Sequence, residues 1–117
     1  MPQLIKQPNS TGEKVAIIFR KTTTGYTHPF CIFAVFPEQC EDYCGEYLAA
    51  YAQLGQHHNI SYDYYHASKP AEPHEYETLL KEIKGVYWDY DIVIYQMITP
   101  KHRKAYKAQY MAFQGKG

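Results

Sequence analysis

Two apolar runs in the first third of the chain predict the centre of a β-sheet. Residues 14–21, KVAIIFRK, are rich in β-branched side chains, and residues 30–36, FCIFAVF, form an almost continuous apolar run between Pro29 and Pro37. Short runs of this composition are typical of buried strands. The turn-prone sequence TTTGYTHP separates them, so we expect the two strands to pair as an antiparallel hairpin.

The segment 47–54, YLAAYAQL, fits two different patterns. Its leucines and alternate alanines recur every second residue, which is the period of a strand. Its tyrosines recur at the spacing of a helix face, and alanine favours a helix. The pattern alone therefore leaves strand and helix open for this segment.

Residues 73–84, PHEYETLLKEIK, carry the clearest helix pattern in the chain. Pro73 suits the first helical turn, and acidic residues near the start with lysines near the end match the helix dipole. We expect Gly85 to cap the C-terminus. Four apolar residues fall on one face of this helix: Tyr76, Leu79, Leu80 and Ile83.

Three further segments complete the predicted elements. Ser61 is expected to cap a short helical turn that runs through Tyr65. Residues 91–99, DIVIYQMIT, alternate between apolar and polar positions and predict a strand that Pro100 ends. Residues 101–114 fit either a short basic helix or a frayed tail.

Together these elements predict an α+β domain. We expect a two-layer sandwich, in which an antiparallel sheet of three or four strands is covered on one face by the helix at about 73–84. Residues 1–13 are predicted to be a flexible N-terminal arm, and 14–100 the single domain. Residues 101–117 form the basic tail or short helix, and the acidic segment 38–46 a loop.

Charge is unevenly distributed, although the formal net charge is zero. Residues 38–91 hold eleven acids and three bases, a net charge of −8, whereas residues 101–117 hold five bases and no acid. Basic tails often contact anions, but this tail could equally lie on the acidic body of its own chain. Because that body would repel a phosphate backbone, nucleic-acid binding is not favoured.

Location and cofactors follow from what the sequence contains. No apolar run reaches eighteen residues and no apolar signal core begins the chain, so we expect a cytoplasmic protein without a membrane segment. Three cysteines suggest free thiols in a reducing compartment. Cys40 and Cys44, followed by His57 and His58, are a weak zinc pattern, because neighbouring residues of a strand point to opposite faces. No metal or other cofactor is therefore expected.

The segment 51–66, YAQLGQHHNISYDYYH, concentrates side chains that form hydrogen bonds and titrate. Histidine titrates near neutrality, so His57 and His58, assisted by Tyr65, are weak candidates for general acid–base catalysis. No phosphate-loop or dinucleotide motif accompanies them. The candidate binding residues of this segment are Tyr51, Gln53, Gln56, His57, His58, Tyr62, Tyr64 and Tyr65.

A structural role for part of this segment is equally open. Gly55 is expected to adopt a backbone conformation that other residues resist. Gln56 and His57 would then bond to backbone groups of the turn that leaves the sheet. A buried, neutral His57 would explain this residue without catalysis.

Several blocks of sequence occur in an order that resembles a group of known proteins. They are AVFPE at 34–38, AYAQLGQH at 50–57, the pair Tyr64–Tyr65, and PAEPHEYETLLKEI at 70–83. They resemble small uncharacterised proteins of bacteriophages and mobile elements, which combine an FP strand end, YAxxGQH and an EYxxLxxEL helix. The resemblance implies a fold and a genetic context, and it favours a strand at 47–54.

These observations favour a small non-enzymatic binding protein that acts through protein–protein contacts, for example by inhibiting a host or defence factor. Tyrosine-rich surfaces provide contact area at low entropic cost, and an acidic middle suits a partner with a basic face. Two alternatives remain. One is a small-molecule or hydrolytic site built on Gln56, His57, His58 and Tyr65. The other is association with nucleic acid through the basic tail.

Overall fold

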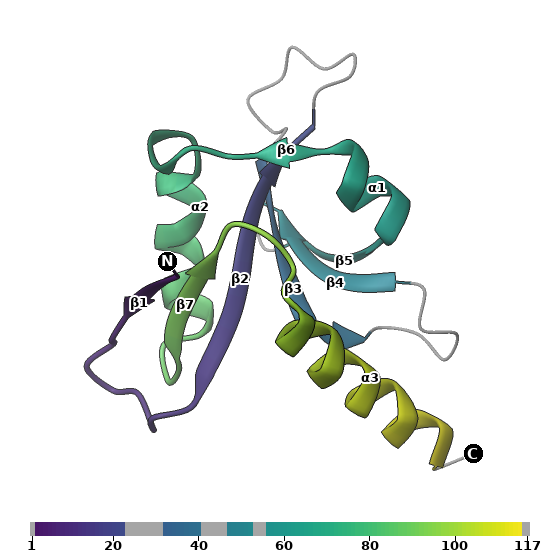
Figure 1. Ribbon diagram of the computed structural model, residues 1–117. Helices are drawn as coiled ribbons and strands as arrows, with labels where there is room; N and C mark the ends of the chain where they lie inside the picture. Colours follow the sequence, from purple (N-terminus) through teal and green to yellow (C-terminus); the bar gives the residue numbers. More distant parts are fainter. Residues whose placement is uncertain (1, 23–31, 41–46, 53–55, 116–117) are drawn as a thin grey trace.

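Strand β2, Lys14–Lys21, lies at the centre of the sheet and pairs with three other strands (Figure 1). The computed structural model describes residues 2–22, 32–40, 47–52 and 56–115. All residues of β2 from Val15 to Arg20 are buried, because helices cover both faces of the sheet. This explains why the sequence of β2 is a continuous apolar run rather than an alternating one.

The described residues form a seven-stranded sheet in the order β1-β7-β2-β3-β4-β5, with the short β6 beside the end of β2. The other strands are β1 Gln3–Ile5, β3 Ile32–Cys40, β4 Tyr47–Ala52, β5 Gln56–Ser61, β6 Lys69–Pro70 and β7 Asp91–Tyr95. Neighbouring strands are antiparallel, except that β2 and β7 are parallel. The long crossover that a parallel pair needs contains helix α2, Pro73–Val86.

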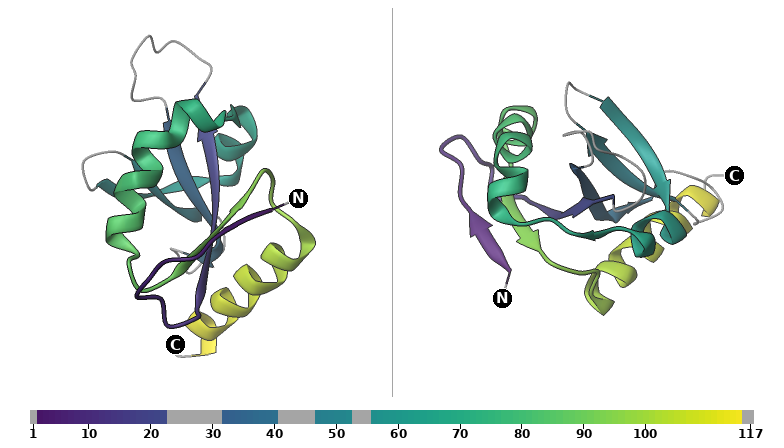
Figure 2. Two further views of the ribbon diagram at one scale, coloured as in Figure 1. Left: turned by 90° about the vertical axis from the view of Figure 1, so that its left-hand side faces the viewer. Right: turned by 90° about the horizontal axis from the view of Figure 1, so that it is seen from above.

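Helices lie on both sides of the sheet, as Figure 2 shows. On one side, Tyr76, Leu79 and Ile83 of α2 belong to a core cluster with Ile17 of β2. On the other side lie α1, Tyr62–Ala67, and α3, Pro100–Gly115. Tyr65 of α1 and Tyr106 of α3 belong to a second core cluster with Ile18, Phe33, Val35, Leu48, Ala50 and Ile60. The protein is therefore a three-layer structure.

The predicted α+β class and the helix over 73–84 are confirmed, but the sheet is larger than the expected three or four strands. The expected two-layer sandwich with an antiparallel sheet is wrong, because helices cover both faces of the sheet and β2 and β7 are parallel. Strand β1 pairs with β7 at Gln3–Ile5, where the sequence predicted an irregular arm. Strands β1 and β6 have three and two residues, too few to show a strand period. Strand β5, QHHNIS, has one apolar residue, so its sequence carries no alternating pattern.

Several predicted boundaries are wrong for local reasons. Strand β3 continues past Pro37 to Cys40, because a bulge between Phe36 and Cys40 shifts its register against β4. The predicted loop at 38–46 therefore begins with strand residues. Gly85 lies inside α2 and does not cap it; the helix ends at Val86, where the Tyr87 N–H bonds to the Ile83 carbonyl.

The prediction of a strand at 47–54 is confirmed for Tyr47–Ala52, and residues 53–55 lie outside the described part of the chain. Ser61 caps α1 as expected, with its Oγ accepting from the Tyr64 N–H at 3.1 Å. Strand β7 ends at Tyr95, short of the expected residue 99. Pro100 begins α3 instead of ending a strand, so residues 100–115 are helical rather than frayed.

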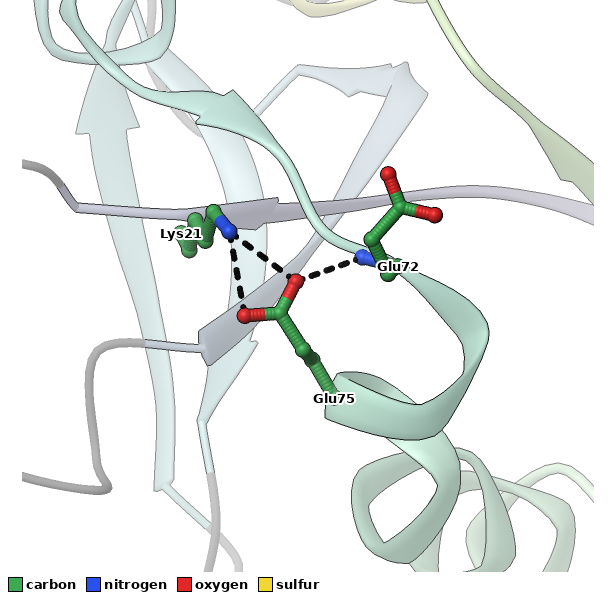
Figure 3. A network of polar contacts seen from close by, with 3 residues as sticks. All are labelled: Lys21, Glu72 and Glu75. Atoms are coloured by element: carbon green, nitrogen blue, oxygen red, sulfur yellow. Dashed lines mark hydrogen bonds and ion pairs between the residues drawn. The ribbon is translucent and has the colours of Figure 1, made fainter.

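A polar contact fastens the start of α2 to the end of β2 (Figure 3). The Glu75 carboxylate accepts the backbone N–H of Glu72 at 2.9 Å and both of its oxygens lie 3.0 Å from Lys21 Nζ. These hydrogen bonds, the backbone one foremost, lower the pKa of Glu75. The contact therefore supports the position of α2 above pH about 4.5, and is lost as Glu75 becomes protonated.

The two central leucines of α2 test its orientation. Leu79 is 1% exposed, whereas Leu80 is half-buried at the edge of the same cluster. We expect Leu79→Ala to lower the free energy of unfolding in urea by about 2–5 kcal/mol, the range for a buried leucine. The matched change Leu80→Ala should cost clearly less. Equal losses from the two variants would contradict the placement of α2 on the sheet.

Candidate functional site

The tyrosines of the predicted site do not share one surface. Tyr51 is 1% exposed and belongs to the core under α2, while Tyr65 is 4% exposed and belongs to the core on the opposite face. The Tyr51 hydroxyl donates to Glu82 Oε1 at 2.6 Å. The Tyr65 hydroxyl accepts the Ile98 N–H at 3.2 Å. Both residues therefore hold the fold together and offer no contact surface to a partner.

Tyr65 also receives a buried cation. The Arg20 guanidinium lies 4.6 Å from the centre of the Tyr65 ring, a cation–π geometry. Arg20 donates to Ser68 Oγ at 2.8 Å and to the carbonyls of Tyr65 and Ser68. The last carbonyls of a helix lack hydrogen-bond donors within the helix. Arg20, a residue of the central strand β2, supplies donors to the carbonyls at the end of α1.

The histidine cluster is placed only by its backbone. Gln56, His57 and His58 lie in the edge strand β5, opposite Ala52, Tyr51 and Ala50 of β4. Their side chains, together with Gln53 and Gly55, lie outside the described part of the structure. The ideas of a shared pocket and of a structural His57 therefore stay predictions.

The weak zinc pattern also falls largely outside the described residues. Cys44 and the side chain of Cys40 are not described. Within the described ranges, no group of three or more histidine, cysteine or acidic side chains could hold a metal ion.

The two other tyrosines of the segment lie at the surface of α1. Tyr64 is 47% exposed and its ring is 5.5 Å from that of Phe33. Tyr62 is half-buried, with its ring edge-on to Tyr106 at 5.7 Å. The Arg103 guanidinium lies 5.9 Å from the Tyr62 ring centre. Tyr62 therefore connects the predicted segment with α3, because its ring contacts Arg103 and Tyr106 of that helix.

Helix α3 presents a face rich in cations and contact-forming side chains. Arg103, Lys107, Tyr110 and Met111 recur at the spacing of one helix face. Arg103, Lys104 and Lys107 are exposed, and Met111 is 59% exposed. We call this region the α3 surface; it consists of Tyr62, Arg103, Lys104, Lys107, Tyr110 and Met111.

The basic side chains of the α3 surface have no acidic partners among the described residues. Residues 100–115 include four basic residues and no acid. Lys104, Lys107 and Arg103 form no ion pair with a residue that the structure describes. An exposed helix of one charge sign attracts partners of the opposite sign and speeds their association.

Two contacts fix α3 against the sheet. At its start, the Thr99 N–H donates to His102 Nδ1 at 3.1 Å, and the His102 N–H donates to Thr99 Oγ1 at 3.2 Å. This reciprocal pair is a capping box with histidine in the place of the usual glutamate. Further along, the Tyr106 hydroxyl donates to the Tyr47 carbonyl at 2.8 Å. The α3 surface therefore belongs to a helix that is attached to the rest of the protein at its start and near its middle.

The basic residues of 101–114 are the part of this surface that the sequence alone shows. Tyr106 is buried in the core cluster beside α3, whereas Tyr110 is half-buried at the edge of that cluster and partly exposed. Arg103, Lys107 and Met111 share one outward face only if the segment is a helix, and the sequence left helix and tail open. The contact with Tyr62 joins residues far apart in sequence, so no local pattern could reveal it.

No protein-family model matches the chain, and comparisons with curated proteins and with solved structures give no significant match. Among the described helices, none is long and apolar enough to cross a membrane.

The buried His102 makes a testable contribution to stability. Burial lowers its pKa, helped by Lys101 and opposed by Glu38. Because the unfolded chain then binds the proton more readily, stability should be full above pH about 6.5 and fall below it. His102→Gln keeps an acceptor for the cap but cannot titrate. Urea melts between pH 5 and 8 should show a weaker pH dependence for this variant; identical profiles would contradict a buried neutral His102.

Proposed function

We propose that this protein is a small non-enzymatic binding protein that contacts an acidic partner protein through the α3 surface. The observation that carries the proposal is the exposed face of α3, where basic side chains lie beside tyrosines and a methionine without any acid in the helix. Tyrosine, arginine and methionine are enriched at protein interfaces. The basic side chains supply selectivity for a negative partner.

A basic partner, which the acidic middle of the sequence suggested, is less well supported. Several acids of residues 38–91 have partners inside the protein. Glu75 pairs with Lys21, and Glu82 accepts from Tyr51. Asp91 accepts the Gln7 N–H at 3.1 Å. Acids that bind groups within the protein contribute little to the surface potential. The negative potential of residues 38–91 is therefore weaker than their net charge of −8 implies.

A non-enzymatic role is supported by how the buried polar side chains are used. Arg20 completes the end of α1, and His102 caps the start of α3. Asp91 binds the chain that follows β1. Each of these groups has a structural task, so none of them points to a reaction.

The resemblance to phage and mobile-element proteins fits this proposal. A small protein from such a source acts most simply by covering a surface of a host or defence protein in the cytoplasm. A preformed helix suits this task, because little conformational freedom is lost when it binds.

Nucleic acid is the second candidate for the α3 surface, since phosphates also attract lysine and arginine. Tyr62 and Tyr110 could stack on bases of a single strand. We favour a protein because exposed Met111 offers an apolar contact at the C-terminal end of the basic stripe.

Photo-crosslinking tests this proposal directly. Met111→p-benzoylphenylalanine, added to nuclease-treated bacterial lysate, should yield a distinct protein adduct. The same group at Glu77, an exposed position of α2 on the opposite side of the sheet, should not. With the purified partner, Arg103→Glu plus Lys107→Glu should weaken binding by at least about tenfold, since interface hot spots contribute about 2 kcal/mol or more.

The matched control is Lys81→Glu plus Lys84→Glu on α2, which changes the net charge equally without touching the α3 surface. Binding of the native protein should also weaken as salt is raised, because exposed charges are screened. Equal loss in both double variants would show a net-charge effect only. Adducts that form only in lysate without nuclease treatment would assign the surface to nucleic acid instead.

A further inference from the structure

Strands β2 and β3 separate from one another along their length (Figure 1). Their pairing runs from Lys21↔Ile32 to Ile18↔Val35 and stops there. Beyond this point β2 pairs with β7 and β3 pairs with β4. The seven-stranded sheet is therefore split at its centre.

Pro37 gives a physical reason for the split. Continuing the register past Ile18↔Val35 would place Pro37 opposite Ala16. Proline has no N–H, so it cannot donate to the Ala16 carbonyl, and the ladder loses a hydrogen bond at this step. The bulge of β3 after Phe36 then turns the strand toward β4.

A cleft of about 300 Å³ lies in the split. Lys14, Val15 and Ala16 of β2 form one wall, and Phe36, Glu38 and Gln39 of β3 the opposite wall. Tyr87 and Tyr90, which follow α2, lie at one side, and Ala105 and Gln109 of α3 at the other. The volume is at the lower end of the range for ligand sites, about 300–1,000 Å³.

The backbone of β2 faces this cleft with open hydrogen-bonding groups. The Glu13 carbonyl accepts the Asp91 N–H, and the Phe19 carbonyl accepts the Ala71 N–H, both on the side of β2 away from β3. Because successive residues of a strand direct their N–H and C=O to opposite sides, Lys14 and Ala16 direct theirs toward the split. No described strand pairs with them there.

Ala16 is more shielded from water than a residue of an ordinary sheet edge, whereas Lys14 is exposed. Ala16 is 8% exposed, and Val15 beside it is buried. Buried backbone N–H and C=O groups are almost always paired in folded proteins. The cleft thus combines a strand edge that pairs with no described strand and the aromatic side chains of Phe36, Tyr87 and Tyr90.

We propose that this cleft binds an extended, uncharged segment of a partner polypeptide, which adds to β2 as a short strand. The backbone of such a segment repeats its donors and acceptors at the spacing of Lys14 and Ala16, a recognised mode of peptide binding. Phe36, Tyr87 and Tyr90 would contact its apolar side chains. Lys14 and Glu38 carry opposite charges, so the cleft favours neither an acidic nor a basic segment.

This site is separate from the α3 surface. Ala105 and Gln109 are the residues of α3 that line the cleft, whereas the α3 surface is built on Arg103, Lys107 and Met111. The two sites can therefore be tested by different variants, and loss of one leaves the other intact.

Amide exchange of the free protein tests the open edge first. Val15 and Ile17 direct their N–H groups toward β7, so their amides should exchange slowly. The Ala16 amide should exchange at least about tenfold faster than either neighbour, since no strand protects it. An Ala16 amide as protected as its neighbours would overturn the proposal, because the edge would then be closed within the chain.

Peptide binding is tested next, with fluorescein-labelled, C-amidated hexapeptides that alternate threonine with valine, isoleucine, phenylalanine or tyrosine. We expect members of this library to bind in fluorescence polarisation and to slow exchange of the Lys14 and Ala16 amides. Gln109→Trp should weaken binding at least about tenfold by filling the cleft. Ala108→Trp, on an exposed neighbouring position of α3, is the matched control.

Thermal melts of both tryptophan variants establish that each is folded before binding is compared. Binding that survives Gln109→Trp, or that leaves the two amides unchanged, would overturn the proposal. So would the absence of binding by every peptide of the library at millimolar concentration. Arg103→Glu plus Lys107→Glu should leave peptide binding unchanged, which separates this site from the α3 surface.

Discussion

The burial of β2 on both of its faces is the constraint on which the rest of the structure depends. Its residues alternate between the core under α2 and the core beside α1 and α3. A shift of β2 by one residue would exchange the two sets of side chains, so both helix layers fix the same register. Strands β3, β6 and β7 pair directly with β2, so the position of β2 sets theirs.

Buried and partly buried polar contacts attach the helices to this centre. Arg20 reaches from β2 to the end of α1, and Lys21 binds Glu75 at the start of α2 (Figure 3). Each joins a helix terminus, where backbone groups lack partners, to the strand that sets the register. Tyr106 ties α3 to β4 in a similar way. The hydrophobic layers supply the driving force, and these contacts select one arrangement of the helices.

Both proposed binding features involve α3, although they use different sides of it. Its outward face carries the basic and apolar side chains of the α3 surface, and Ala105 and Gln109 close one side of the split between β2 and β3. The helix packs closely on β3, the strand that Pro37 and its bulge turn away from β2. The separation of β3 from β2 thus opens the cleft, and it also sets the position of the strand on which α3 packs.

The sequence by itself determined the elements that bury a periodic or continuous apolar pattern: β2, most of β3, Tyr47–Ala52 of β4, and α2. In each, local spacing carries the information, because burial of one face or of both faces repeats along the chain. Only the tertiary structure decided the short strands β1 and β6, the polar edge strand β5, the burial of Tyr51 and Tyr65, and the split beside Ala16. Those features depend on pairing between residues distant in sequence, and a pairing partner leaves no mark in the local pattern.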